Sequence, residues 1–260
     1  MDSWRTAIVS TGDGNIRVRG YNVTELMTRA TFTDTIFLLQ RGRLPSAGER
    51  KLLDALLTGC ADHGSGAPSC AAARLAASGN RASLSAAVAA GLLAIGDEHG
   101  GAGEQCMEMI ARGVAKAKSE PASSEPTSMA AVAARELAES KAAGRKVPGL
   151  GHRVHKTRDP RTNILFAIAR AESLAGDGVA FMEGLESALE QEGKTLPINI
   201  DGALAAILYD LGFEPPAGKL MFIVARVAGL AAEVAEEHGR EKPMRIRIPV
   251  EYDGEPPREI

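Results

Sequence analysis

The stretch from Ala82 to Gly96 contains no charged residue. A helix that is apolar on nearly every side must be buried in a protein core or against another subunit. The stretch is too short to cross a bilayer as a helix. The whole chain is rich in alanine and glycine and only 4% of its residues are aromatic, which favours closely packed helices over a sandwich or a barrel. We therefore expect a mostly α fold.

Length and charge limit the classes of function. The chain has 260 residues, enough for one large core or for a core with a small cap. Its 45% hydrophobic and 24% charged residues are ordinary for a globular protein, so it should fold. A net charge of −3 disfavours nucleic acid or an anionic membrane as the main partner, so an anionic ligand would have to be met by local arginines.

The three cysteines, Cys60, Cys70 and Cys106, form no CxxC pair. A zinc site built from Cys60, His63 and Cys70 would lack a standard ligand spacing, so we expect no metal. No apolar segment with a small-residue cleavage site opens the sequence, and a cytoplasmic location is the expectation.

Local signals place several elements. Alternating polarity from Ala7 to Val18 around Asp13-Gly14 predicts a small N-terminal hairpin. Ser46-Ala-Gly-Glu49 is typical of a capping box that opens a helix through Leu57. Residues 119–128, with two prolines and several serines, indicate a linker, and an alanine-rich helix follows to about Ala143. That helix could belong to a small mobile lid.

The second half begins with a glycine-rich, basic stretch, Gly144 to Arg158. Asp159-Pro160 then predicts a helix start, with Asp as N-cap and Pro at the first helical position, and such a junction is a natural anion site. Glycines near the expected helix ends should supply left-handed C-terminal conformations, namely Gly176, Gly193, Gly212 and Gly239. The tail from Met244 to Tyr252 is predicted to be extended.

Four of the five histidines lie in polar or glycine-rich breaks between apolar segments, namely His63, His99, His152 and His155. A single histidine is often structural. Imidazoles that are repeatedly flanked by glycine, however, suggest a backbone drawn close to a ligand. Both interpretations stay open on this pattern alone.

Three segments carry a family resemblance: Asp97-Glu-His-Gly-Gly-Ala, Pro148-Gly-Leu-Gly-His-Arg-Val and Asn199-Ile-Asp-Gly. Their order is that of the catalytic segments of the citrate synthase family, which this chain resembles over nearly its whole length. The resemblance implies a multi-helix fold with a short N-terminal β-hairpin. It implies a large helical domain, residues 1–110 and 195–260, and a smaller mobile CoA-side domain, residues 111–194. It also implies a homodimer or a higher homo-oligomer.

The implied chemistry makes or breaks the carbon–carbon bond between acetyl-CoA and oxaloacetate. A thioester methyl is a very weak acid, so this chemistry needs a positioned base and a donor that stabilises the enol or enolate. The resemblance assigns Asp201 to the methyl proton, His99 to the thioester carbonyl and His152 to the ketone. As bland alternatives, Asp201 could be an N-cap and His99 could cap a turn.

Binding roles follow from the same resemblance. Arg161, Arg226 and Arg247 match arginines that bind substrate carboxylates, Arg247 across a dimer interface, and His63 matches a substrate-binding histidine. Asp62 beside His63 leaves a structural pairing open. The coenzyme A thioester would be a substrate, with no permanently bound cofactor. Backbone and basic groups that could meet it are Gly100, Gly101, Gly149, Gly151, Arg153 and Lys156, and a merely solvated basic loop is the alternative.

The sequence also departs from the family pattern. Gly103, His155 and Gly202 stand where an asparagine, a tyrosine and an aromatic residue are usual, and a long helical region is missing between Pro45 and Ala61. The short length favours citryl-CoA lyase and the citrate-synthase-like C-terminal module of ATP-citrate lyase, whereas His99 resembles a synthase. We therefore lean to citryl-CoA cleavage. Citrate or 2-methylcitrate synthase is the alternative, and a non-catalytic paralogue that binds CoA or carboxylates belongs to another class.

Overall fold

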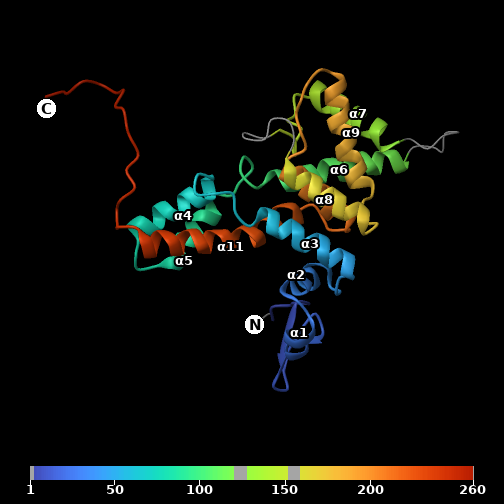
Figure 1. Cartoon of the computed structure of the whole chain (residues 1–260), viewed down its shortest axis with the longest axis horizontal. Coiled ribbons are helices and arrows are strands. Elements are labelled where there is room, and N and C mark those ends of the chain that lie inside the picture. Colours follow the sequence, from blue (N-terminus) through green and yellow to red (C-terminus); the bar gives the residue numbers. More distant parts are fainter. Residues whose placement is uncertain (1–2, 120–127, 152–158, 260) are drawn as a thin grey trace. The chain divides into compact units, whose positions relative to one another are not determined.

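The computed structural model describes residues 3–119, 128–151 and 159–259 (Figure 1). Within these residues there are eleven helices and one three-stranded antiparallel sheet, so the predicted mostly α fold with a small N-terminal hairpin is confirmed. None of the helices described here is both long and apolar enough to span a membrane.

Contacts divide the chain into two compact units, Met1–Asp62 with Gly96–Arg226, and His63–Ile95 with Val227–Ile260. The first unit contains β1 (Val9–Gly12), β2 (Asn15–Val18), β3 (Tyr21–Asn22), α1 (Val23–Arg29), α2 (Phe32–Arg41), α3 (Ala47–Cys60), α6 (Ala102–Ser119), α7 (Met129–Ala142), α8 (Pro160–Ala171), α9 (Asp177–Gln191) and α10 (Ile200–Asp210). The second contains α4 (Pro68–Gly79) and α5 (Leu84–Leu93). Helix α11 (Ala217–Arg240) contributes to both. The expected large and small domains are a different kind of division and stay a prediction.

The hairpin turn explains the first local signal. Asp13 and Gly14 adopt φ angles of 51° and 71°, and Gly12 pairs with Asn15 across the turn. Positive φ at both central residues is the geometry that joins twisted antiparallel strands most tightly, and Asp-Gly adopts it at little cost. The predicted hairpin is therefore confirmed.

Helix starts also follow their predicted signals. Ser46 and Glu49 exchange side-chain and backbone hydrogen bonds, which confirms the capping box of α3, although that helix continues to Cys60 rather than ending at Leu57. At α8 the carboxylate of Asp159 accepts a hydrogen bond from the backbone N–H of Arg161, and Pro160 takes the first helical position. These starts depend on local chemistry, and the sequence alone is enough to place them.

Of the four glycines predicted as C-terminal caps, two are confirmed. Gly193 and Gly212 have φ angles of 77° and 75° just after α9 and α10. The prediction is wrong for Gly176, which is the N-cap of α9, and for Gly239, which lies inside α11. Gly176 follows a turn whose left-handed residue is Ser173, so that chain reversal uses another position.

Helix α10 is the centre of the first unit. Eight of the nine positions from Ile200 to Leu208 are buried, and Asp201 is the exception. It packs against α6, α9, α8 and α3. The carboxylate of Asp210 accepts backbone N–H groups of Gly176, Gly178 and Val179 at 2.7–3.0 Å, so the end of α10 holds the start of α9.

The second unit has a small-residue core. Helices α4 and α5 pack together with the second half of α11, and the core consists of Ala67, Cys70, Ala73, Ala77, Ala87, Leu230 and Val234. Helix α5 belongs to the uncharged stretch, yet only Ala87 and Gly91 are buried in it. Of the two predicted settings, burial in the core of its own chain does not describe this helix, and the subunit contact stays a prediction.

Ion pairs fix the chain that follows α11. Arg74 pairs with Glu233 and Glu237, and Arg245 pairs with the same fully buried Glu237. The N–H of Met244 donates to the carbonyl of Ser78 at 3.0 Å. Beyond this anchor the tail has no regular secondary structure up to residue 259, which agrees with the predicted extended segment in being non-helical.

Candidate active site

Two motif segments of the first unit pair as a short antiparallel ladder. Leu150 lies opposite Ile198, the N–H of Asn199 donates to Gly149 at 3.1 Å, and the N–H of Gly151 donates to Pro197 at 2.8 Å. The ladder brings the residue before His152 beside the residues before Asp201. Two segments that are about fifty positions apart in sequence therefore meet at the start of α10.

Glycine is required at the closest point of this contact. A Cβ on Gly202 would lie 2.3 Å from the carbonyl oxygen of Gly149, and Gly149 itself has a φ of 81°. A side chain at either position would collide with the opposite backbone. The family usually has an aromatic residue at the position of Gly202. In this chain the close approach of the Gly149 backbone explains why a glycine is needed there.

Asn199 joins the ladder to the candidate base. Its side-chain oxygen caps α10 by accepting from the N–H groups of Asp201 and Gly202, and its side-chain amide donates to Gly151 at 2.8 Å. Asp201 therefore is not the N-cap. It lies at the second helical position and keeps part of its surface exposed.

The environment of Asp201 suits proton transfer. Burial raises the pKa of this carboxyl group above its ordinary value, and the positive charges of Arg161 and Arg226 oppose the rise without cancelling it. A carboxylate with a raised pKa is a stronger base when ionised, and it also holds a proton more readily near neutral pH. Such a perturbed acid next to two arginines is typical of a functional site.

Both arginines are held by the C-terminal end of α3. The guanidinium of Arg226 donates from Nε to the carbonyl of Cys60 at 3.1 Å, and that of Arg161 donates from Nη1 to Gly59 at 3.3 Å. The last carbonyls of a helix are unsatisfied within the helix and carry partial negative charge, which favours cations. Arg161 also makes a bidentate pair with the fully buried Asp159, at 3.0 and 2.8 Å.

The Cys60 thiol lies close enough to Asp201, Arg161 and Arg226 for their charges to affect its pKa. Burial and the negative charge of Asp201 raise the pKa of Cys60 to about 12, while Arg161 and Arg226 oppose that rise. All three cysteines are buried, and none forms a disulfide among the described residues. The thiol is therefore not a nucleophile near neutral pH, and Cys60 acts through its carbonyl.

His99 lies in a tight loop that leads into α6. Gly96 and His99 exchange both backbone hydrogen bonds at 2.9 Å, and a Cβ on Gly100 would lie 2.3 Å from the ring of Phe222. The His99 ring stands edge-on to Phe222, with centroids 6.2 Å apart, and the guanidinium of Arg226 lies 4.7 Å from the centroid of the same ring. Phe222 thus links His99 to Arg226.

Helix α6 joins the third motif segment to the other two. Its Cys106 lies against the ladder, because a Cβ on Gly149 would be 2.8 Å from the Cys106 sulfur. The charge of Asp201 also contributes to the raised pKa of Cys106. The segments that contain His99, Gly149 and Asp201 therefore converge on one region of the first unit.

The remaining predicted residues are distributed differently. Gly100, Gly101, Gly149 and Gly151 belong to the loops just described, with Gly101 packed against the Gly96 carbonyl. His152, Arg153, His155 and Lys156 lie outside the described residues. His63 and Arg247 are exposed and belong to the second unit.

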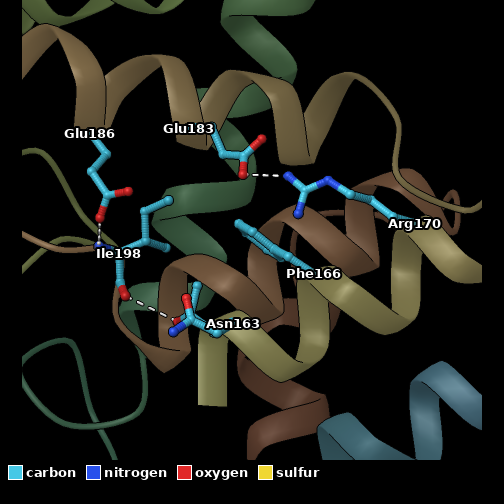
Figure 2. Close-up of a pocket in the computed structure, with 7 residues that line it drawn as sticks. Asn163, Phe166, Arg170, Glu183, Glu186 and Ile198 are labelled. Atoms are coloured by element: carbon cyan, nitrogen blue, oxygen red, sulfur yellow. Dashed lines mark hydrogen bonds and ion pairs between the residues drawn. The ribbon is translucent and has the colours of Figure 1, made fainter. Parts of the chain in front are cut away.

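Several side chains that support the site were not predicted. Asp159 was expected only as a helix cap, and Phe222, Thr162 and Glu186 were not singled out. Thr162 and Glu186 help line a pocket of about 200 Å³ beside Ile198, where the backbone N–H of Ile198 donates to Glu186 (Figure 2). The sequence signals of Glu186 and Phe222 are ordinary positions on amphipathic helices, so only the fold distinguishes them.

Comparison with known proteins gives a consistent result. Residues 46–247 match the family model of the citrate synthase C-terminal domain. A citrate/2-methylcitrate synthase of Bacillus subtilis (strain 168) is 29% identical over 223 residues, which are 84% of this chain and 55% of that protein. The chain thus spans about half the length of this curated relative, and less of several others.

Solved structures are also similar. A citryl-CoA lyase from Hydrogenobacter thermophilus superposes with a TM-score of 0.89 and 38% identity, covering 99% of this chain and 97% of that one. An ATP citrate lyase of Methanosaeta concilii, solved in complex with (3S)-citryl-CoA, gives a TM-score of 0.77 at 19% identity over 97% of this chain and 42% of that chain, which shows a shared fold.

Proposed function

Because the chain belongs to the citrate synthase family, we propose that it is a citryl-CoA lyase, which cleaves citryl-CoA to acetyl-CoA and oxaloacetate. One observation carries the choice of reaction within the family. The similarity to a citryl-CoA lyase covers 99% of this chain at 38% identity, whereas the similarity to the synthase relative covers 84% of it at 29% identity.

The proposed cleavage is a proton-coupled bond rupture. His152, assigned by family resemblance, takes the proton of the citryl hydroxyl group. The bond between the carbinol carbon and the thioester methylene then breaks. The carbinol oxygen becomes the oxaloacetate ketone, and the bonding electron pair moves into the thioester as an enolate. His99 donates a hydrogen bond to the enolate oxygen, and Asp201 gives its proton to the methylene carbon.

The raised pKa of Asp201 supports this role. Cleavage needs a protonated carboxyl at the moment the enolate forms, and a raised pKa keeps the proton on the acid closer to neutral pH. In the reverse direction the same ionised group is a stronger base towards a thioester methyl. The group can therefore serve both directions of the reaction.

We assign different residues to the carboxylates of the substrate and to its coenzyme A portion. We assign the carboxylates of the oxaloacetate half to Arg161, Arg226 and His63, and Arg247 to the site of a partner subunit. The coenzyme A portion enters with the substrate and needs no permanently bound cofactor. Its assigned contacts are Gly100, Gly101, Gly149, Gly151, Arg153 and Lys156.

The decisive experiment supplies both reactions to the purified protein. Citryl-CoA should be consumed to give acetyl-CoA and oxaloacetate, with little free coenzyme A. Rapid release of free thiol from acetyl-CoA and oxaloacetate, with citrate as product, would overturn the lyase assignment in favour of a synthase. Binding of citryl-CoA without turnover in either assay would identify a non-catalytic paralogue.

Citrate or 2-methylcitrate synthase is the second candidate. The match with the Bacillus subtilis citrate/2-methylcitrate synthase over 84% of the chain and the presence of His99 favour it. Acetyl-CoA and propionyl-CoA differ by one methylene, which a pocket distinguishes only by about 1–3 kcal/mol. The free-thiol assay should therefore be run with both thioesters and several 2-oxo acids.

We also propose that the protein is a homodimer through α5. This uncharged helix leaves Leu84 48% and Leu93 87% exposed, which is costly in water. Replacing both leucines with glutamate should halve the mass measured by light scattering, whereas Met27→Glu on α1, where Met27 is also exposed, should not change it. A double variant that keeps the mass of the parent protein would reject α5 as the contact.

A further inference from the structure

Ile198 belongs to the ladder beside the site, but its own backbone N–H and C=O groups make no hydrogen bond to the opposite strand. Leu150 and Ile198 face each other, but the ladder bonds are made by their neighbours, Gly149 with Asn199 and Gly151 with Pro197. In such a pair the N–H and C=O groups of the central residue point away from the partner strand. Ile198 is only 3% exposed, so both groups need partners inside the protein.

Two helices supply those partners. A carboxylate oxygen of Glu186 in α9 accepts the Ile198 N–H at 2.9 Å, and the hydroxyl of Thr162 in α8 donates to the Ile198 carbonyl at 3.0 Å. Thr162 is buried, and Glu186 is partly exposed at the pocket wall. Side chains from α8 and α9 therefore hold the two backbone polar groups of one residue.

We propose that Glu186 is a positioning residue, which fixes the Asp201 carboxylate by holding the backbone N–H of Ile198. The inference rests on the proposed function, because it assigns Glu186 a part in that reaction. Glu186 does not touch the reacting atoms. It acts on the backbone three residues before Asp201, next to the cap that Asn199 forms.

The path from Glu186 to Asp201 is short and made of hydrogen bonds. Ile198 is followed directly by Asn199, whose backbone N–H donates to Gly149 and whose side chain caps the first turn of α10. A shift of the Ile198 backbone would move this cap and the ladder together. Misplacement of a catalytic group by about 1 Å costs on the order of 100-fold in rate.

The same pocket offers a matched control. Glu183 lies one turn before Glu186 on α9 and lines the same pocket, but its carboxylate pairs with Arg170 of α8 instead of the backbone (Figure 2). The two glutamates share a helix, a pocket and a charge. They differ in whether they hold the peptide that leads to Asp201.

Three variants of the full chain test the inference. Glu186→Met removes the acceptor with little change in helix propensity, Glu186→Gln keeps an amide oxygen in its place, and Glu183→Met is the control. Hydrogen exchange of the segment after Pro197 should become faster in Glu186→Met. It should stay close to the parent value in the other two variants.

Turnover supplies the second readout. In Glu186→Met, kcat for citryl-CoA cleavage should fall by about 10–100-fold and KM should rise by much less, since the acid is misplaced while the arginines assigned to the substrate carboxylates keep their own tethers. Glu186→Gln should restore most of kcat, and Glu183→Met should retain it. A merely structural role would lower the melting temperature without this separation of kcat from KM.

The outcomes separate the two proposals. Unchanged hydrogen exchange in Glu186→Met, or faster exchange with parental kcat, overturns the positioning role. An equal loss of kcat in Glu183→Met also overturns it, because that result would reflect the pocket in general. Absence of turnover in the parent protein overturns the proposed function instead, while the exchange data still report whether Glu186 holds Ile198.

Discussion

Helices α5 and α10 are nearly the same length, 10 and 11 residues, and both consist mostly of alanine and larger aliphatic residues. Their surroundings differ. Helix α10 is enclosed by α6, α9, α8 and α3, whereas α5 packs against α4 and part of α11 and leaves one face open. Composition alone therefore does not tell a central helix from a surface helix.

The two helices also differ in the charged residues at their ends. Asp201 and Asp210 lie at the two ends of α10, and Gly202 to Leu208 between them are buried. One acid takes a place in the candidate site, and the other holds the start of α9. Helix α5 has no charge at either end, which suits a face meant to contact another chain.

The largest expected effect is that of replacing Asp201 at the N-terminal end of α10. Asp201→Asn should lower turnover by about 100–10,000-fold, the usual contribution of a general acid or base. A turnover close to that of the parent protein, measured in both reaction directions, would remove Asp201 from the mechanism. Binding of citryl-CoA should persist in the variant, measured by calorimetry, because the carboxylate contacts remain.

The same substitution has a stability consequence. Burial raises the pKa of Asp201 above its unfolded value, so the ionised group destabilises the fold at neutral pH, and this penalty disappears as pH falls through the raised pKa. Asp201→Asn should therefore keep or raise the melting temperature at pH 7. The gain should shrink at acidic pH, and a lower melting temperature at pH 7 would contradict this sign.

Truncation of leucines compares the two helices directly. Leu204 in α10 is fully buried, so Leu204→Ala should lower the free energy of unfolding by about 2–5 kcal/mol. Leu93 at the end of α5 is 87% exposed, and Leu93→Ala should cost less than about 0.5 kcal/mol when measured on monomers. Equal costs in chemical denaturation would mean that the two environments do not differ as described.

A methyl group tests the closest backbone approach at α10. Gly202→Ala would place a Cβ 2.3 Å from Gly149 and should cost about 1–3 kcal/mol together with much of the activity. Gly59→Ala is the control, since its Cβ would meet only Ile200 at 3.8 Å, and alanine favours helices. Thermal unfolding should separate the two variants clearly.

The smallest effect concerns the helix ends. Asp210→Asn keeps one acceptor for the three N–H groups at the start of α9 but loses the other and the charge, for a cost of about 1 kcal/mol. Ser83 caps α5 through one hydrogen bond at 3.2 Å, so Ser83→Ala should cost about 0.5 kcal/mol. A larger loss of unfolding free energy in Ser83→Ala than in Asp210→Asn, measured by denaturant titration, would contradict the stronger capping by Asp210.

Local chemistry explains what could be predicted from sequence. The Asp13-Gly14 turn, the Ser46 capping box and the Asp159-Pro160 helix start each depend on residues within four positions of one another. The mostly α fold followed from composition. Motif order allowed Asp201, His99 and two arginines to be proposed together, and the structure brings their segments to one region.

Long-range pairing explains what could not. Arg161 was expected to meet a ligand, but its carboxylate partner Asp159 is visible only when the side chains are in place. Glu183 and Glu186 look alike in the sequence, and one contacts Ile198 while the other pairs with Arg170. The exposure of α5 depends equally on which helices surround it, which periodicity does not encode.

The end of α3 has a consequence for the acid at the site. If the guanidinium groups of Arg161 and Arg226 were free to swing onto Asp201, a direct ion pair would pull its pKa down and leave a poor proton carrier. Carbonyl oxygens of Gly59 and Cys60, with Asp159, tether them instead. The C-terminal end of α3 thus holds two guanidinium groups where an anionic ligand can reach them. It also keeps them from forming an ion pair that would lower the pKa of Asp201.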